Sequence, residues 1–158
     1  MDINHLTLLT DLYELTMMQG YFKTGNDETV VFDVFYRDNP SGSGYAITCG
    51  LDQVIDYLRN QGIFDEDFLE YLAGYHFTGD IYAIAEGTVV FPREPLLKVK
   101  APIMEAQLVE TALLNIINHQ SLIATKASRV VYAAGGSGVM EFGLRRAQGP
   151  DAGTYGAR

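Results

Sequence analysis

The spacing of the apolar residues changes along this 158-residue chain, and these changes limit its fold more than any other feature. From residue 103 to about residue 127 the apolar positions recur at the period of an α-helix, the longest such pattern in the chain. Between residues 81 and 102 they recur at a period of two, which is typical of strands. Helices and strands are partly segregated, which predicts an α+β fold rather than a doubly wound parallel sheet.

Several shorter elements are expected before residue 81. Residues 6–21 predict an amphipathic helix, which Thr10 or Asp11 can cap and Gly20 can end. Residues 29–37 predict a strand that leads into a loop, and a short strand is expected at 45–49. Two short helices, at 51–60 and 66–71, follow it.

After residue 81, prolines at positions 92 and 95 favour edge strands or a hairpin. Two further short elements are expected at residues 130–134 and 139–142, on either side of a Gly-Gly-Ser-Gly loop. That loop lacks the lysine of a P-loop, so we interpret it as a tight turn.

The composition is that of a folded protein with one sizeable core, since 47% of the residues are hydrophobic and 20% are charged. Cys49 is the one cysteine, which excludes an internal disulfide and indicates a reducing compartment, by default the cytoplasm. Acidic residues at the N-terminus argue against a secretory signal. Polar residues interrupt the most apolar long stretch, 103–117, so we expect no membrane-spanning segment.

The net charge of −9 argues against a nucleic-acid binder. Residues 1–79 carry 13 acidic and three basic residues, whereas residues 80–158 carry seven acidic and eight basic ones. An anionic ligand is therefore expected to bind in the second half.

The segment 141–155 is the first candidate site, because it combines Phe142, Arg145 and Arg146 with glycines. Guanidinium groups offer a planar fork to phosphate oxygens, and glycines let backbone N–H groups approach. The alternative is a solvated helix end with a Glu141–Arg145 pair, followed by a turn. The chain stops directly after this segment, and we expect it to be truncated.

Asp11 and Tyr13 form a second candidate site, because both can line one cleft at a helix start. The alternative is a core tyrosine beside a capping aspartate. The three histidines, His5, His76 and His119, have no partner at the spacing of a helical metal site and are interpreted as structural. Cys49 has no neighbouring base and is not expected to be a nucleophile.

Five segments together resemble nicotinate phosphoribosyltransferases. The most distinctive are Thr-Asp-Leu-Tyr-Glu-Leu-Thr-Met at 10–17 and Glu-Phe-Gly-Leu-Arg-Arg-Ala-Gln-Gly-Pro-Asp at 141–151. Residues 44–51, 86–92 and 108–115 also match. The resemblance covers essentially the whole chain.

This resemblance implies a cytoplasmic enzyme of NAD synthesis that joins nicotinate to phosphoribosyl pyrophosphate, with ATP hydrolysis coupled and Mg²⁺ required. It also implies the α+β N-terminal domain of a type II phosphoribosyltransferase at residues 1–128. Residues 129–158 would begin an irregular α/β barrel. The phosphorylated histidine and the 5′-phosphate loops of the family would lie beyond Arg158, so the chain alone is expected to be inactive.

The resemblance also assigns site residues. Tyr13, preceded by Asp11, is similar to an aromatic residue that stacks on the pyridine ring in the neighbouring subunit of a homodimer. Phe142 is similar to the aromatic residue on the opposite ring face, and Arg145 to an arginine that contacts phosphate oxygens and serves catalysis. Arg146 and Thr154 are further candidates, and no metal ligand is assigned. The alternatives are a nicotinamide phosphoribosyltransferase and a non-catalytic dimerisation module.

Overall fold

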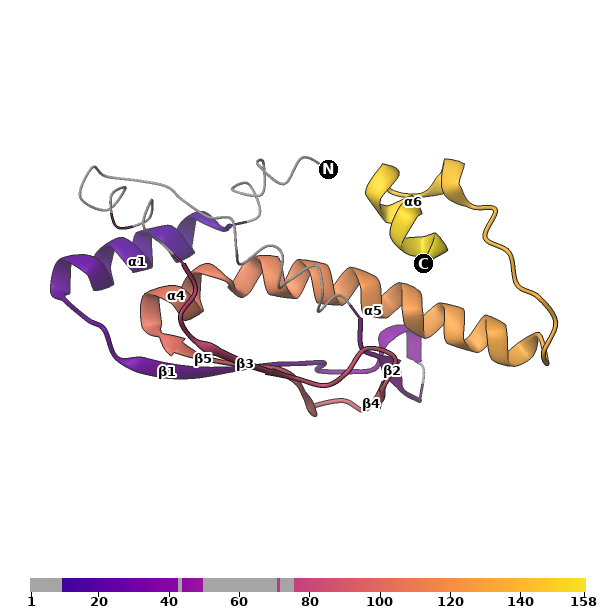
Figure 1. Ribbon diagram of the computed structural model, residues 1–158, viewed down its shortest axis with the longest axis horizontal. Helices are drawn as coiled ribbons and strands as arrows, with labels where there is room; N and C mark the ends of the chain where they lie inside the picture. Colours follow the sequence, from indigo (N-terminus) through magenta and orange to yellow (C-terminus); the bar gives the residue numbers. More distant parts are fainter. Residues whose placement is uncertain (1–9, 43, 50–70, 72–75) are drawn as a thin grey trace.

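A computed structural model describes residues 10–42, 44–49, 71 and 76–158. Its longest element is the helix α5 (Glu110–Ala133), which continues from the short helix α4 (Ile103–Leu108) after a turn at Val109. The strands lie along one side of these two helices, and α1 (Leu12–Thr24) lies beside α4 (Figure 1). The predicted α+β class is confirmed.

Three antiparallel strands form the main sheet, in the order β1 (Thr29–Phe35), β5 (Pro95–Pro102) and β3 (Asp80–Ala83). A separate two-stranded sheet pairs β2 (Ala46–Ile47) with β4 (Val89–Val90). Two short 3₁₀ helices, η2 (Pro40–Gly42) and η3 (Leu144–Arg146), and the helix α6 (Pro150–Ala157) complete the described elements.

The core lies between β5 and the helices α4 and α5. Alternate β5 residues face the helices, as the period of two predicts. The buried apolar residues of this core include Leu97, Val99 and Ala101 on β5 and Ala106, Ala112, Leu113, Ile116 and Ile117 on the helices.

The expectation from the prolines is wrong for β5, which is the central strand of its sheet. Pro95 and Pro102 are the first and last residues of this strand, so neither removes an N–H from the interior of the ladder. Pro92 lies in the turn before β5.

The C-terminal part of α5 differs from the prediction as well. The helix runs to Ala133, so the separate element expected at 130–134 is wrong, as is the one at 139–142. Val130 and Val131 lower helix propensity by only a few tenths of a kcal/mol each, and no Gly or Pro interrupts the helix before Gly135. Gly135 and Gly136 both have positive φ, and they form the tight turn that the sequence predicts.

At the N-terminus, Asp11 is the N-cap of α1, and Gly25, with φ 65°, ends the helix. Gly20 therefore lies within the helix rather than at its end. The strand predicted at 29–37 is confirmed, and the one at 45–49 is present in shorter form as β2. Residues 6–9 and the helices predicted at 51–60 and 66–71 lie outside the described residues, except Tyr71, which is helical. The domain boundary expected at residue 128 lies within α5 and stays a prediction.

Hydroxyl groups along one face of α5 bind the segment that contains β2. Ser121 Oγ accepts the Cys49 N–H at 3.0 Å, and Thr125 Oγ1 accepts the Ile47 N–H at 2.8 Å. One turn further, Ser128 bonds to the Tyr45 hydroxyl at 3.0 Å. Among the described residues β2 pairs with β4 alone, so the bonds from Ser121 and Thr125 satisfy N–H groups that the small sheet leaves open.

Two buried glutamates connect the helices to the rest of the molecule, each through one threonine. Glu14 on α1 accepts the Thr111 N–H at 2.9 Å and the Thr111 hydroxyl at 2.7 Å. Glu105 on α4 accepts the Thr78 N–H at 2.7 Å and the Thr78 hydroxyl at 2.8 Å. Both side chains are below 8% exposed, and a buried carboxylate needs such bonds to offset its lost hydration.

Gly79, next to Thr78, is required by close packing, since a Cβ there would lie 2.6 Å from the Lys100 carbonyl oxygen. We predict that Gly79→Ala lowers the free energy of unfolding by about 1–3 kcal/mol. Gly20→Ala is the matched control, because a Cβ at that helical position meets nothing within 4 Å. This control should raise stability by about 0.5–1 kcal/mol. Urea unfolding measures both, and shifts of the same sign would contradict the packing argument.

The burial of Glu14 predicts a pH dependence of stability. Desolvation raises the Glu14 pKa above the ordinary value of 4.5, against the hydrogen bonds from Thr111 and Asp11, which lower it. The folded protein therefore holds this proton more tightly than the unfolded chain does. Stability must then fall as the pH rises from 4.5 through the folded-state pKa.

Glu14→Gln keeps an oxygen acceptor for Thr111 but cannot titrate, so this component of the pH dependence should disappear. Urea unfolding of both proteins at a series of pH values between about 4 and 8 tests it. Parallel curves for the two proteins would show that Glu14 titrates as it does in the unfolded chain.

Candidate functional site

A pocket of about 400 Å³ opens where the first turn of α1 meets the end of β1 and the start of α5. One wall is polar, with Asp11, Tyr13, Glu110 and Thr111, and Asn115 and Asn118 extend it along α5. The apolar wall consists of Val34, Phe35, Tyr36, Leu96, Leu114 and Ile117. The pocket therefore offers aromatic and apolar surface for a ring beside hydrogen-bonding groups.

Tyr13 lies at the rim of this pocket and is 46% exposed, so the alternative of a core tyrosine is wrong. Desolvation, an interaction of its hydroxyl with the Glu110 carboxylate in the manner of a hydrogen bond, and the charges of Glu110, Glu14 and Asp11 raise the Tyr13 pKa to about 12. The phenol is therefore protonated at neutral pH and acts as a donor.

Asp11 caps α1, as the alternative interpretation predicts, and it lines the pocket as well. Its backbone N–H donates to Glu14 at 3.3 Å, and its carboxylate accepts from the Thr111 hydroxyl at 3.1 Å. Glu110 is fixed on its other side by the Gln107 amide, which donates to it at 3.1 Å.

The C-terminal candidates lie elsewhere. Phe142 is 77% exposed, and Arg145 and Arg146 are exposed on η3. Neither arginine takes part in an ion pair among the described residues, and Glu141 instead accepts the Gly143 N–H. The alternative of a Glu141–Arg145 surface pair is therefore wrong, and both guanidinium groups are open to an anion. Thr154, on α6, donates its hydroxyl to the Pro150 carbonyl at 3.0 Å.

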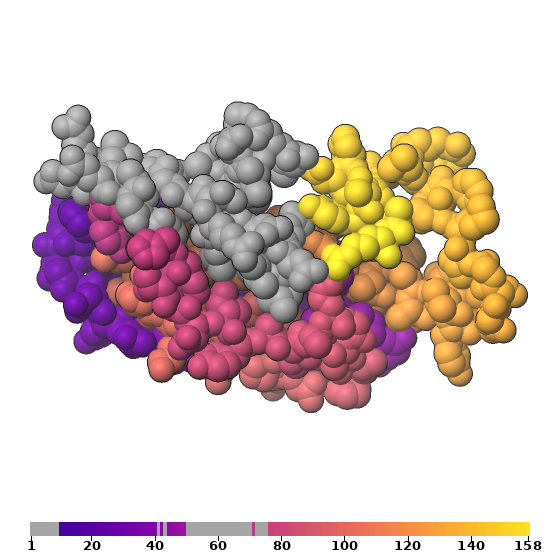
Figure 2. Space-filling model, viewed as in Figure 1, coloured from indigo at the N-terminus to yellow at the C-terminus, as the bar shows by residue number. Residues whose placement is uncertain are grey.

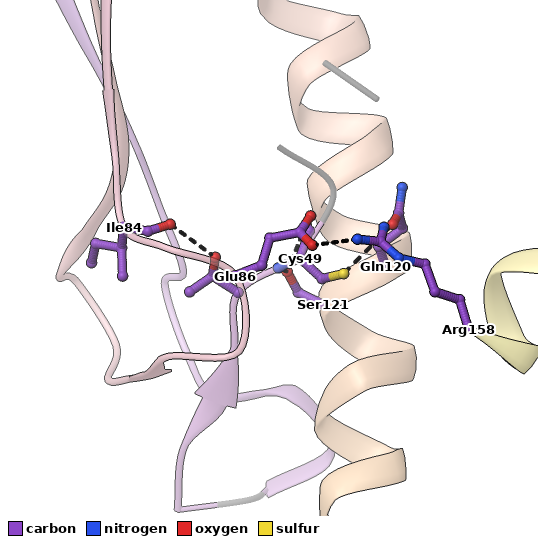
Figure 3. A network of polar contacts seen from close by, with 7 residues as sticks. Cys49, Ile84, Glu86, Gln120, Ser121 and Arg158 are labelled. Carbon is purple, nitrogen blue, oxygen red and sulfur yellow. Dashed lines mark hydrogen bonds and ion pairs between the residues drawn. The ribbon is translucent and has the colours of Figure 1, made fainter. Parts of the chain in front are cut away.

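Arg158 differs from the other two arginines, since its guanidinium pairs with Glu86 at 2.7 Å (Figure 3). In the same region the Cys49 thiol lies 3.5 Å from the Gln120 amide oxygen. An amide is not a base, so this contact does not activate the thiol as a nucleophile.

Within one chain the two candidate groups are not brought together. Asp11 and Tyr13 lie beside the start of α5, whereas α6 packs farther along the same helix (Figure 1). On the face shown in Figure 2, α1 and the C-terminal segment lie at opposite sides.

The sequence analysis missed Glu14, Glu110 and Thr111. The Asp-x-x-Glu spacing of Asp11 and Glu14 is the pattern of a capping box and could have indicated Glu14. Thr111 carries no comparable local pattern.

The described part of the chain contains no group of three or more His, Cys, Asp or Glu residues that could hold a metal ion. His5 lies outside it. No helix in the same part combines the length and apolar content needed to cross a bilayer.

Comparison with known proteins gives consistent matches. The model of the nicotinate phosphoribosyltransferase (NAPRTase) N-terminal domain matches residues 8–118. Nicotinate phosphoribosyltransferase pncB2 of Mycobacterium tuberculosis is 48% identical over 164 residues, covering 96% of this chain and 35% of the relative. For the nicotinate phosphoribosyltransferase of Bacillus subtilis, identity is 45%, with 97% and 34% covered.

The crystal structure of human nicotinic acid phosphoribosyltransferase superposes with a TM-score of 0.83 at 35% identity, covering 93% of this chain and 34% of the human chain. The chain thus spans about a third of the length of the proteins it matches. Sequence and fold agree over nearly all of its residues, and the chain belongs to the nicotinate phosphoribosyltransferase family.

Proposed function

We propose that this chain is the N-terminal part of an enzyme that joins nicotinate to phosphoribosyl pyrophosphate, giving nicotinate mononucleotide and pyrophosphate for NAD synthesis. The observation that carries the proposal is the 48% identity to a nicotinate phosphoribosyltransferase over 96% of the chain. Both relatives are nicotinate phosphoribosyltransferases, which supports nicotinate over nicotinamide as the substrate. The cytoplasmic location and the coupling to ATP hydrolysis belong to the same proposal.

The exposed groups suit the two substrates. Phe142 and Tyr13 each present an aromatic surface, and an electron-poor pyridine ring stacks well on such surfaces. Arg145 has an open guanidinium group for phosphate oxygens. Displacement of pyrophosphate builds negative charge on the leaving group, and a fixed arginine stabilises that charge.

Magnesium is part of the proposal through the family resemblance alone. The described residues provide no cluster that fits the ion, so we assign none of them to it and derive no step through it. Residues on the remaining length of the family's proteins, together with the pyrophosphate of the substrate, would have to hold it.

The separation of α1, which carries Tyr13, from the C-terminal segment, which carries Arg145, supports a homodimer with shared sites (Figure 2). In a two-fold dimer each surface occurs twice, so Tyr13 of one copy can complete the site that holds Phe142 and Arg145 of the other. Arg146 and Thr154 would belong to the second group. The alternative of a non-catalytic dimerisation module predicts the same contact without catalysis.

A chimera tests the activity. In it, this chain replaces the matched third of the Bacillus subtilis relative, which supplies the missing length. We expect the chimera to form nicotinate mononucleotide from nicotinate and phosphoribosyl pyrophosphate, and the 158-residue chain alone to form none. Product is measured by chromatography, with the intact relative as the positive control and nicotinamide as the competing substrate. A folded, dimeric chimera that forms no product would favour the dimerisation module.

Mixed dimers of that chimera test the shared site. Tyr13→Ala and Arg145→Ala homodimers should both be weak, because each lacks one residue in every site. Random mixing places half of the dimers in the mixed state, each with one intact site, so activity should recover to about a quarter of the parent value. If the mixture gives only the average of the two homodimers, Tyr13 and Arg145 serve sites within their own subunits.

A further inference from the structure

Thr111 bonds to the residues on both sides of Tyr13. Its hydroxyl lies 2.7 Å from Glu14 Oε1 and 3.1 Å from Asp11 Oδ2, and its N–H donates to Glu14 at 2.9 Å. Asp11 lies two positions before Tyr13 in the sequence, and Glu14 lies one position after it. Thr111 of α5 therefore holds both the N-cap residue and the first turn of α1 in place.

The hydroxyl has a distinct part in this arrangement. It has a single proton, which the two carboxylates share as a three-centre bond. The bond from the backbone N–H reaches Glu14 alone, so the hydroxyl is the only Thr111 group that holds Asp11. Without it, the N-terminal side of Tyr13 loses its tie to α5.

Tyr13 needs such a tie because packing alone does not hold it. Its side chain is 46% exposed, and the preceding residue, Leu12, is 73% exposed. The direction of the ring therefore depends on how firmly its backbone is held to the first turn of α5.

We propose that Thr111 is a positioning residue, which fixes the first turn of α1 and thereby aims the Tyr13 ring at the pocket rim. Its consequence for catalysis rests on the proposed function, in which Tyr13 contacts the pyridine ring. The positioning itself is a property of the chain and can be tested without catalysis.

The second buried glutamate supplies a matched control. Thr78 bonds to Glu105 through the same two groups at similar distances, but it does not line the Tyr13 pocket. Thr78→Val removes a hydroxyl bond to a buried carboxylate, as Thr111→Val does. Both variants should lose comparable stability, and only Thr111→Val should affect Tyr13.

The first experiment uses the 158-residue chain. Because the sequence contains no tryptophan, Tyr13→Trp introduces a single tryptophan at the position of interest, and its fluorescence can be excited at wavelengths where the tyrosines do not absorb. Time-resolved anisotropy then reports the fast local motion of the indole ring. We expect Thr111→Val to increase the amplitude of this motion roughly twofold, Thr111→Ser to restore it, and Thr78→Val to leave it unchanged. Equal amplitudes in the two valine variants would overturn the proposal.

The second experiment uses the chimera and a double-mutant cycle. Thr111→Val should lower kcat/KM for nicotinate by roughly ten- to a hundredfold, since small misplacements of a binding group are costly. Thr111→Ser should restore most of it. In a Tyr13→Ala background, Thr111→Val should cause no further loss, because its effect passes through Tyr13.

An undiminished loss in the Tyr13→Ala background would overturn the proposal in favour of a merely structural role. If the parent chimera forms no product, the proposed function fails, and the anisotropy of the indole still decides whether Thr111 positions residue 13.

Discussion

The structure depends on the burial of one carboxyl group, that of Glu14, at the point where two helices meet. The Glu14 carboxylate is fully buried, and the bonds that offset its lost hydration come from the first turn of α5 and the cap of α1. The N-terminus of a helix favours negative charge, because its N–H groups lack partners within the helix. Among the described residues, the apolar cluster of α1 has Leu15, Met18 and Leu108 as its buried members, so the bonds of Glu14 add to a small apolar contact.

This constraint also shapes the candidate site. Asp11 and Thr111 belong to the hydrogen-bond network around Glu14 and also line the pocket. The fold and the site therefore share these two residues. Tyr13 is carried at the rim by the same helical turn. A residue on such a short, firmly bonded turn is presented with little freedom, which suits stacking on a flat ring.

The sequence predicts the local features of this site and not the long-range ones. An aspartate directly before a helical pattern of apolar residues indicates an N-cap, as Asp11 is. The adjacent glycines at 135 and 136 indicate the turn that follows α5. The bond from Thr111 to Glu14 joins residues 97 positions apart, and no local pattern encodes such a pair. The central position of β5 was not predicted, because a proline argues against a central strand only where it removes an N–H group from the interior of the ladder. Pro95 and Pro102 lie at the two ends of β5.

The C-terminal segment carries large apolar side chains that the rest of the described chain leaves uncovered. Phe142, Met140 and Leu144 are 77%, 73% and 63% exposed, although each is large and apolar. Grouped exposure of this kind is typical of surfaces that contact another chain or domain, since water disfavours it. The arginines among these residues are open as well, so one surface offers both apolar area and positive charge. Apolar area together with positive charge suits an aromatic anion with a phosphate group better than either feature alone. The nucleotide of the proposed reaction has this chemical character.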